Sequence, residues 1–255
     1  MSKKLENAKN LYLKCIKEGN INVVDEYTGA RYTQHSTGVS DGAEGFKEFF
    51  SDFLNRTNNR DIRVIRAIED GRNVFVHVYQ DIDNGKAKWV TTDMFDTDEN
   101  DKMIEHWDVI AAYTEVEDTV SGNDVILGDF ELKDLDKTEE NKELVKNLIN
   151  DVFQNGKHHL IDKYIHNDCI QHAPHLLNGI ESIKKLLAEK DIYYDFIFKI
   201  IGQGDYVVSY SKILIEGKEF SGFDIFRVEN RMIVEHWENK ELIPSRSELT
   251  NCGKF

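Results

Sequence analysis

The spacing of apolar residues predicts one order of elements that occurs twice in the chain, with helices first and strands afterwards. An early set on one helical face is Leu5, Ala8, Tyr12, Cys15 and Ile16. A later set with the same kind of spacing is Leu144, Val145, Leu148, Ile149, Val152 and Phe153. A further helical face follows in each half, formed by Phe46, Phe49, Phe50 and Phe53 and by Ile180, Ile183, Leu186 and Leu187. With a short segment at 23–27 between its two longer helices, the first half opens with three helical segments, and the second half is expected to match it.

Runs rich in β-branched and aromatic residues come after these helices and predict four strands in each half. The ranges are 62–68, 74–79, 88–95 and 103–109, and then 196–201, 206–215, 219–228 and 232–238. Helices followed by a meander of strands indicate the α+β class, with helices on one face of an antiparallel sheet. We expect such a sheet to curve around its helices and to enclose a cone-shaped pocket.

An internal repeat supports two homologous domains. Gln34-His35 recurs as Gln171-His172, 137 positions later, and Asp93-Met-Phe95 recurs as Asp224-Ile-Phe226, 131 positions later. Glu105-His-Trp107 likewise matches Glu235-His-Trp237 at 130 positions. These matches predict domains at 1–115 and 138–255. The acidic segment 116–137 is expected to be an extended, solvated linker, in which 125–127 could form a short strand.

Composition and charge narrow the class of protein. Hydrophobic residues make up 40% of the 255 residues and only 2 are proline, which indicates a globular chain. The net charge of −15 makes nucleic acid and anionic membranes poor partners. The absence of an apolar core in the first six residues, Met1 to Glu6, predicts no signal peptide and a cytoplasmic location. Three widely spaced cysteines, Cys15, Cys169 and Cys252, are expected to be free thiols.

The last two strands of each half are expected to bring an aspartate beside a histidine. A three-residue connection at 229–231 places Asp224 opposite His236, and a tight turn at 99–100 places Asp93 opposite His106. A two-residue turn at 229–230 would instead place Asp224 beside Glu235 and Trp237. An Asp–His pair in a partly dry pocket can move a proton on or off a carbon acid. The alternative is that each pair only satisfies its own polarity between buried strands.

Two further histidines, His35 and His172, precede turn-rich loops and are expected at the rim or wall of the pocket, where they would contact substrate. The alternative is a Gln–His pair that ties the loop to the sheet. Trp107 and Trp237 alternate with the strand histidines and are therefore expected to pack on the other face of the sheet.

A metal site is a weaker interpretation. The spacing His166-x-x-Cys169-x-x-His172-x-x-His175 resembles that of metal ligands. The equivalent positions in the first half include Gly29 and Gly38, so the halves do not share this ligand set, and no metal is expected.

These motifs resemble the SnoaL-like polyketide cyclases of the nuclear transport factor 2-like superfamily, over nearly the whole chain. The residues that carry the resemblance are Gln171-His172-Ala173-Pro174-His175, Asp224-Ile-Phe-Arg227 and Ile233-Val-Glu-His-Trp237. The resemblance implies two cone-shaped domains, each of three helices on a curved antiparallel sheet, arranged as an intrachain pseudo-dimer. It also implies cofactor-free acid–base chemistry, such as aldol-type cyclisation, on a small hydrophobic carbonyl compound. A ligand-binding protein without catalysis and a protein-interaction scaffold of the same fold are the alternatives.

The site residues implied by this resemblance lie in both halves, with the closer match in the second. The expected catalytic residues are Asp224, His236, His172, Asp93, His106 and His35. The expected substrate contacts are Tyr210, Glu238, Asp108 and Tyr32.

Overall fold

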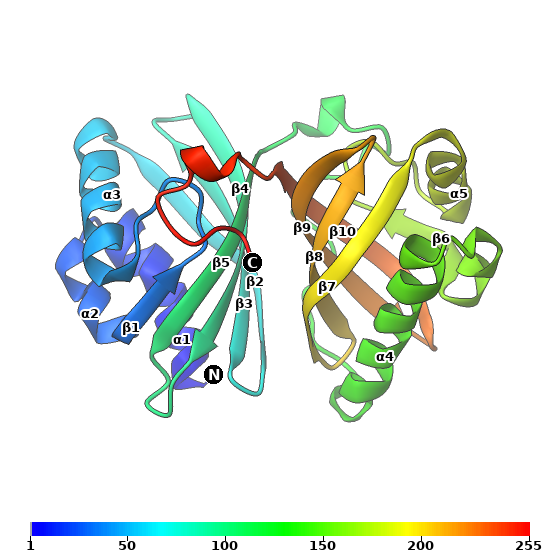
Figure 1. Cartoon of the computed structure of the whole chain (residues 1–255), viewed down its shortest axis with the longest axis horizontal. Helices are drawn as coiled ribbons and strands as arrows, with labels where there is room; N and C mark the ends of the chain where they lie inside the picture. The colour runs from blue at the N-terminus through cyan, green and yellow to red at the C-terminus, as the bar shows by residue number, and fades with distance from the viewer. Residues whose placement is uncertain (1) are drawn as a thin grey trace. The chain divides into compact units, whose positions relative to one another are not determined.

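The structure is a computed structural model that describes residues 2–255 and separates into two compact units. Met1, one of the six residues considered for a signal peptide, lies outside the described residues. Unit 1 runs to Tyr113 and also includes Pro244–Phe255, whereas unit 2 is Thr114–Ile243. Each unit contains helices packed against one five-stranded sheet, so the predicted α+β class and tandem organisation are confirmed (Figure 1). The pseudo-dimer implied by the resemblance stays a prediction.

Unit 1 begins with α1 (Lys3–Asn10), which continues as a π-helical segment, η1 (Leu11–Lys17). The other elements are η2 (Ile21–Val23), α2 (Val24–Tyr27), β1 (Thr28–Gln34), α3 (Gly42–Arg56), β2 (Arg60–Asp70), β3 (Asn73–Ile82), β4 (Ala87–Thr97), β5 (Met103–Ala112) and the C-terminal η7 (Arg246–Glu248). The strand order is β1-β5-β4-β3-β2. All four predicted strands are present, and each is somewhat longer than predicted.

Unit 2 repeats this order after an irregular segment. Its elements are η3 (Val116–Asp118), η4 (Leu135–Lys137), α4 (Thr138–Leu148), η5 (Ile149–Gln154), η6 (His158–Lys163), β6 (Ile165–Gln171), α5 (Ile180–Glu189), β7 (Ile192–Gln203), β8 (Tyr206–Ile215), β9 (Lys218–Glu229) and β10 (Met232–Leu242). The strand order, β6-β10-β9-β8-β7, is that of unit 1. In both units the first long helix is followed by a glycine with a left-handed backbone, Gly19 (φ 75°) and Gly156 (φ 64°).

A fifth strand in each sheet, β1 or β6, was not predicted. It pairs in parallel with the last strand of its unit, and the ladder joins Gln34 to His106 and Gln171 to His236. Three successive residues in the middle of β6 are exposed, and β1 has a similarly exposed centre, so neither strand shows a continuous alternation. The sheets are therefore mixed, with four antiparallel strands and one parallel edge strand.

The predicted register of the last hairpin in each unit is wrong by two positions. Asp93 pairs with Asp108, and Asp224 pairs with Glu238. In unit 2 the turn has two residues with positive φ, Asn230 and Arg231, and a register shift between Ile233 and Glu235 then displaces the ladder. A shift of two positions leaves every side chain on its original face, so each aspartate stays a diagonal neighbour of its histidine.

The acidic segment 116–137, predicted as a solvated linker, instead lies against unit 2. Ile126 is buried, and the backbone N–H of Val120 donates to the carbonyl oxygen of Pro174 at 2.9 Å. Residues 125–127 form no strand among the described residues. The C-terminal segment Pro244–Phe255 (red in Figure 1) likewise belongs to unit 1, so each unit includes the segment that follows the other repeat.

No described helix combines the length and the apolarity needed to cross a membrane.

Candidate functional site

A cavity of about 250 Å³ lies in unit 1 between the helices and the inner face of the sheet. Most of its wall is apolar, and the aromatic and aliphatic lining includes Phe46, Phe49, Phe50, Phe53, Trp89, Phe95 and Ile110. Phe49, Trp89 and Ile110 are each more than a third exposed, which places the opening of the cavity beside them. The polar lining includes Gln34, Asp93, His106 and Asp108. A mainly apolar cavity with a few polar groups is typical of a small-molecule site.

The polar group of unit 1 is built around Asp93 and His106. Nε2 of His106 lies 2.8 Å from Oδ1 of Asp93, and Nδ1 lies 2.8 Å from Oε1 of Gln34. The hydroxyl of Tyr12 donates to the same Asp93 oxygen at 2.7 Å. The Gln34 oxygen can only accept, so Nδ1 of His106 carries a proton and donates it to Gln34. A second proton, between Nε2 of His106 and Oδ1 of Asp93, can then belong to either residue. The predicted Asp–His contact is therefore present, although it is diagonal across the strands.

Burial and neighbouring charges shift the pKa values of the two aspartates of this cavity in opposite directions. Burial raises the pKa of Asp93, and the neighbouring Asp108 adds to the rise, against the lowering effect of His106. Burial would also raise the pKa of Asp108, but the Lys254 ammonium, His106 and a hydrogen bond from Ser36 hold it below its ordinary value. Asp108 thus favours the ionised form, whereas Asp93 holds a proton more readily than an exposed aspartate does.

Unit 2 repeats this group in a much smaller cavity of about 40 Å³. Nε2 of His236 lies 3.1 Å from Oδ1 of Asp224, and Nδ1 lies 2.9 Å from Oε1 of Gln171. The tyrosine that donates to the aspartate is now Tyr194, which reaches Oδ2 of Asp224 at 2.9 Å.

A largely buried ion pair between Lys240 and Glu238 lies at the polar end of the second cavity. Burial would raise the pKa of Glu238, but Lys240, His175 and His236 together lower it to about 2. The equivalent of Lys240 in unit 1 is Ile110, which leaves that cavity open and apolar at this point.

The two aspartates differ in their remaining hydrogen-bonding capacity. Both carboxylate oxygens of Asp224 accept hydrogen bonds, one from His236 and one from Tyr194. In unit 1, Oδ2 of Asp93 has no hydrogen-bond partner among residues 2–255. Only the first cavity therefore combines space for a ligand with a carboxylate oxygen that is free to meet one.

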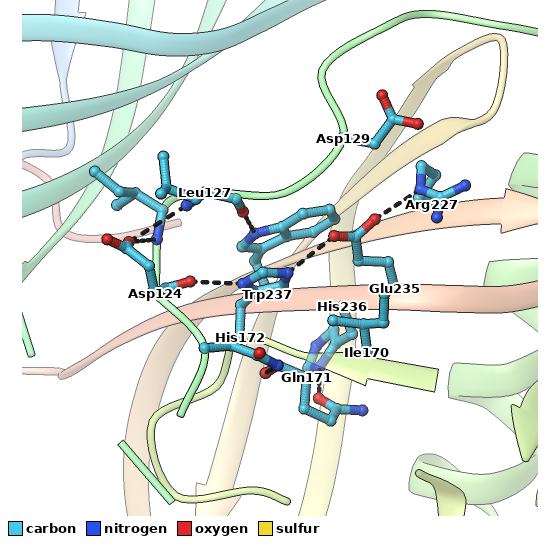
Figure 2. A network of polar contacts seen from close by, with 12 residues as sticks. Asp124, Leu127, Asp129, Ile170, Gln171, His172, Arg227, Glu235, His236 and Trp237 are labelled. Atoms are coloured by element: carbon cyan, nitrogen blue, oxygen red, sulfur yellow. Dashed lines mark hydrogen bonds and ion pairs between the residues drawn. The ribbon is translucent and has the colours of Figure 1, made fainter. Parts of the chain in front are cut away.

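The prediction that His35 and His172 line the pocket is wrong. The preceding residues, Gln34 and Gln171, pair with the strand histidines and face the cavities, so alternation turns the next side chain to the opposite face. There His172 stacks on Trp237, with ring centroids 4.6 Å apart, and contacts Glu235 through Nε2 and the carbonyl oxygen of Asp124 through Nδ1 (Figure 2).

His35 has the same surroundings on the outer face of unit 1. It stacks on Trp107 with centroids 5.1 Å apart and contacts Glu105 and the carbonyl oxygen of Gly253. Both tryptophans pack on this face, as predicted. Each outer histidine thus contacts the segment that follows the other repeat. The alternative from the sequence, a pair with the preceding glutamine, is also wrong, because Gln34 and Gln171 bond to His106 and His236.

The predicted substrate contacts are divided between the two faces. Tyr32, Asp108 and Glu238 line the cavities. Tyr210 does not, because Ser209 pairs with Asp224 and the next residue faces outward, where Tyr210 stacks on Phe223 at 4.3 Å. The prediction for Tyr210 is therefore wrong.

Sequence reasoning missed four polar residues of the two sites, Tyr12, Gln34, Gln171 and Tyr194. The glutamines had a signal, because each precedes a repeated histidine and keeps the same spacing in both halves. The tyrosines had none, since Tyr12 lies in η1 and its repeat equivalent is Ile149, whereas Tyr194 lies in β7.

Two groups of side chains have the spacing of metal ligands. They are Asp93, His106 and Asp108 in unit 1, and Asp224, His236 and Glu238 in unit 2. In each group one carboxylate is already ion-paired with a buried lysine, Lys254 or Lys240, whose positive charge opposes a bound cation.

Gly128 allows the acidic segment to approach the outer face of unit 2. Its φ is +129°, and a Cβ there would clash with the Trp237 ring and the Glu235 carboxylate. We expect Gly128→Ala to lower the free energy of unfolding by about 1–3 kcal/mol, measured by urea unfolding with tryptophan fluorescence. Gly122→Ala is the control, because Gly122 also has positive φ but a methyl group added there would meet no other atom within 4 Å. Equal losses in the two variants would contradict the steric explanation.

No family model and no curated protein matches the chain. Among solved structures, it resembles an NTF2-like protein of unknown function from Cytophaga hutchinsonii, with 16% identity and a TM-score of 0.37 over 40% of this chain and 89% of the other. An LEH-like epoxide hydrolase of M. tuberculosis has 18% identity and a TM-score of 0.37 over 41% and 85%. IdmH of Streptomyces antibioticus, provisionally described as a polyketide cyclase, has 18% identity and a TM-score of 0.35 over 40% and 92%. Each of these likenesses covers a stretch of the chain about as long as one unit.

Proposed function

We propose that unit 1 is a general acid–base catalyst that acts on a small, uncharged carbonyl compound. The observation that carries the proposal is Asp93, a buried carboxyl that Tyr12 and His106 hold by one oxygen at the polar end of an apolar cavity. Its other oxygen has no partner among the described residues. The SnoaL-like cyclisation chemistry expected from the sequence is one reaction of this class.

The raised pKa of Asp93 suits it to take a proton from carbon. A carboxylate that resists ionisation is a stronger base than an exposed one, and its conjugate acid can return the proton in the next step. His106 can share that proton through Nε2 while Gln34 holds its other nitrogen. The apolar wall favours uncharged substrates, because a charged group would lose its hydration there.

Unit 2 is proposed to be a structural copy without turnover. Its cavity is about 40 Å³, and both oxygens of Asp224 are engaged. The sequence pointed to the second half, where the resemblance to the cyclases is closer, whereas the proposed active unit is the first.

The proposal is tested by deuterium exchange of a simple ketone. The probe is 2-tetralone, an uncharged bicyclic ketone with acidic α-protons, and its exchange in D2O is followed by proton NMR with and without protein. We expect exchange above the buffer rate. Binding of 2-tetralone without exchange would instead favour the non-catalytic ligand-binding alternative. A wild-type protein that neither binds nor exchanges it would leave this proposed substrate class without support.

The residue at position 110 provides a sharper test of the cavity. We expect Ile110→Lys, which introduces the residue that unit 2 has at the equivalent position, to slow the exchange about tenfold or more, because a charged chain replaces apolar wall at the opening. Ile110→Met keeps an apolar chain of similar size and should retain most of the rate. Equal rates for the Lys and Met variants would place the reaction elsewhere.

A further inference from the structure

Unit 1 contains a buried cation, Lys254, that comes from the end of the chain, after the second repeat. Lys254 lies in the C-terminal segment Pro244–Phe255, and its side chain is 0% exposed. Its Nζ lies 3.1 Å from Oδ1 of Asp108 and donates to the backbone carbonyl oxygen of the same residue at 3.0 Å. An ammonium group so fully buried is normally found only with an anionic partner, which here is Asp108.

The C-terminal segment is held in place by specific contacts with unit 1. The side-chain amide of Asn251 donates to the carbonyl oxygens of Ser36 and Val39 at 2.7 and 2.8 Å. The carbonyl oxygen of Gly253 lies 2.5 Å from Nδ1 of His35. Ser36 and Val39 both line the cavity, so the segment fixes part of the cavity wall as well as Lys254.

Asp108 lies directly opposite Asp93 on the neighbouring strand. One of its oxygens accepts from Ser36 at 2.6 Å and the other faces Lys254. The other titratable side chains around Asp93 are Tyr12 from η1, His106 from β5 and Tyr32 from β1. Lys254 is the cation that contacts Asp108.

Lys254 therefore favours the charge on Asp108 over a charge on Asp93. With the ammonium in place, Asp108 remains ionised, and its negative charge disfavours ionisation of Asp93. Unit 2 has no such contribution. In unit 2 the equivalent of Asp108 is Glu238, and its cation is Lys240 of the same strand.

We propose that Lys254 is a positioning residue of the unit 1 site, so that the site is incomplete without the C-terminal segment. Lys254 acts on Asp93 through Asp108 and does not line the cavity itself. The role of Lys254 in the reaction rests on the proposed function. Its effect on the protonation of Asp93 and Asp108 can be measured without a substrate.

The experiment compares full-length wild type, Lys254→Met and Lys254→Arg by carbon NMR titration of the labelled Asp93 and Asp108 carboxyl groups. In Lys254→Met we expect the midpoint of Asp108 to move up and that of Asp93 to move down, because Asp108 then loses its cation and takes up the proton. Lys254→Arg keeps the charge and should retain the wild-type order. Unchanged midpoints in Lys254→Met would overturn the proposal.

A double variant covers the case in which Lys254→Met does not fold. Lys254→Met with Asp108→Asn removes both charges, so no uncompensated ion is left buried. The midpoint of Asp93 should again lie below that of wild type, and the midpoint of the pH profile for 2-tetralone exchange should follow it. An unchanged Asp93 midpoint in the double variant would refute the inference. Wild-type protein without exchange, but with the expected NMR midpoints, would refute only the proposed function.

Discussion

Asp93→Asn is expected to lower the rate of 2-tetralone exchange by about 10²- to 10⁴-fold, the range typical of losing a general base. The amide keeps the size of the carboxyl and can still accept from Tyr12, but it cannot take up a proton. In wild type the rate should rise with pH as Asp93 ionises, with a midpoint above that of an exposed aspartate, because burial raises its pKa. The measurement is the exchange rate as a function of pH for wild type and variant.

The duplicated chain contains its own control for this variant. Asp224→Asn makes the same chemical change at the equivalent position of unit 2, where the cavity is small and the carboxylate is fully hydrogen-bonded. We expect it to leave the exchange rate within about twofold of wild type. Loss of exchange in Asp224→Asn, with retention in Asp93→Asn, would show that the assignment of the active unit is reversed.

The fold could be predicted from the sequence because the same motifs and the same order of helices and strands occur in both halves. The motif at Asp93 recurs at Asp224 in the same order among the other matches, which a chance similarity would not produce. The change from helical to strand spacing in each half then places the helices before the sheet. The edge strands β1 and β6 were missed because each has a run of exposed residues in its middle, so burial does not alternate.

The site was predicted less well because it depends on register and on distant segments. Bulges near Ile104 and Val234 shift the pairing, and Asp93 stayed near His106 only because a two-residue shift keeps each side chain on its face. Nothing local indicates that β1 would turn His35 outward, since this follows from its pairing with β5. Lys254 is 146 positions from Asp108, beyond any local pattern.

Glu238→Gln is expected to destabilise unit 2 strongly. The change leaves the largely buried Lys240 ammonium without its ion-pair partner, and removing one partner of a buried pair typically costs about 3–5 kcal/mol. The measurement is the free energy of unfolding from urea titrations at pH 7. Glu238→Gln combined with Lys240→Met removes both charges and should recover most of the loss. A double variant no more stable than Glu238→Gln would refute the ion-pair explanation.

The pH dependence of this effect has a definite sign. The pKa of Glu238 in the folded protein, about 2, lies below its ordinary value of 4.5, so the ionised form stabilises the fold at pH values above 4.5. At about 1.4 kcal/mol per pH unit, this contribution amounts to about 3 kcal/mol, and it is lost as the pH falls from about 4.5 towards 2. The stability difference between wild type and Glu238→Gln should therefore shrink over that interval and stay constant between pH 5 and 8. A difference that remains constant down to pH 3 would mean that the stability of the fold does not depend on the Glu238 charge, and would contradict the ion-pair explanation.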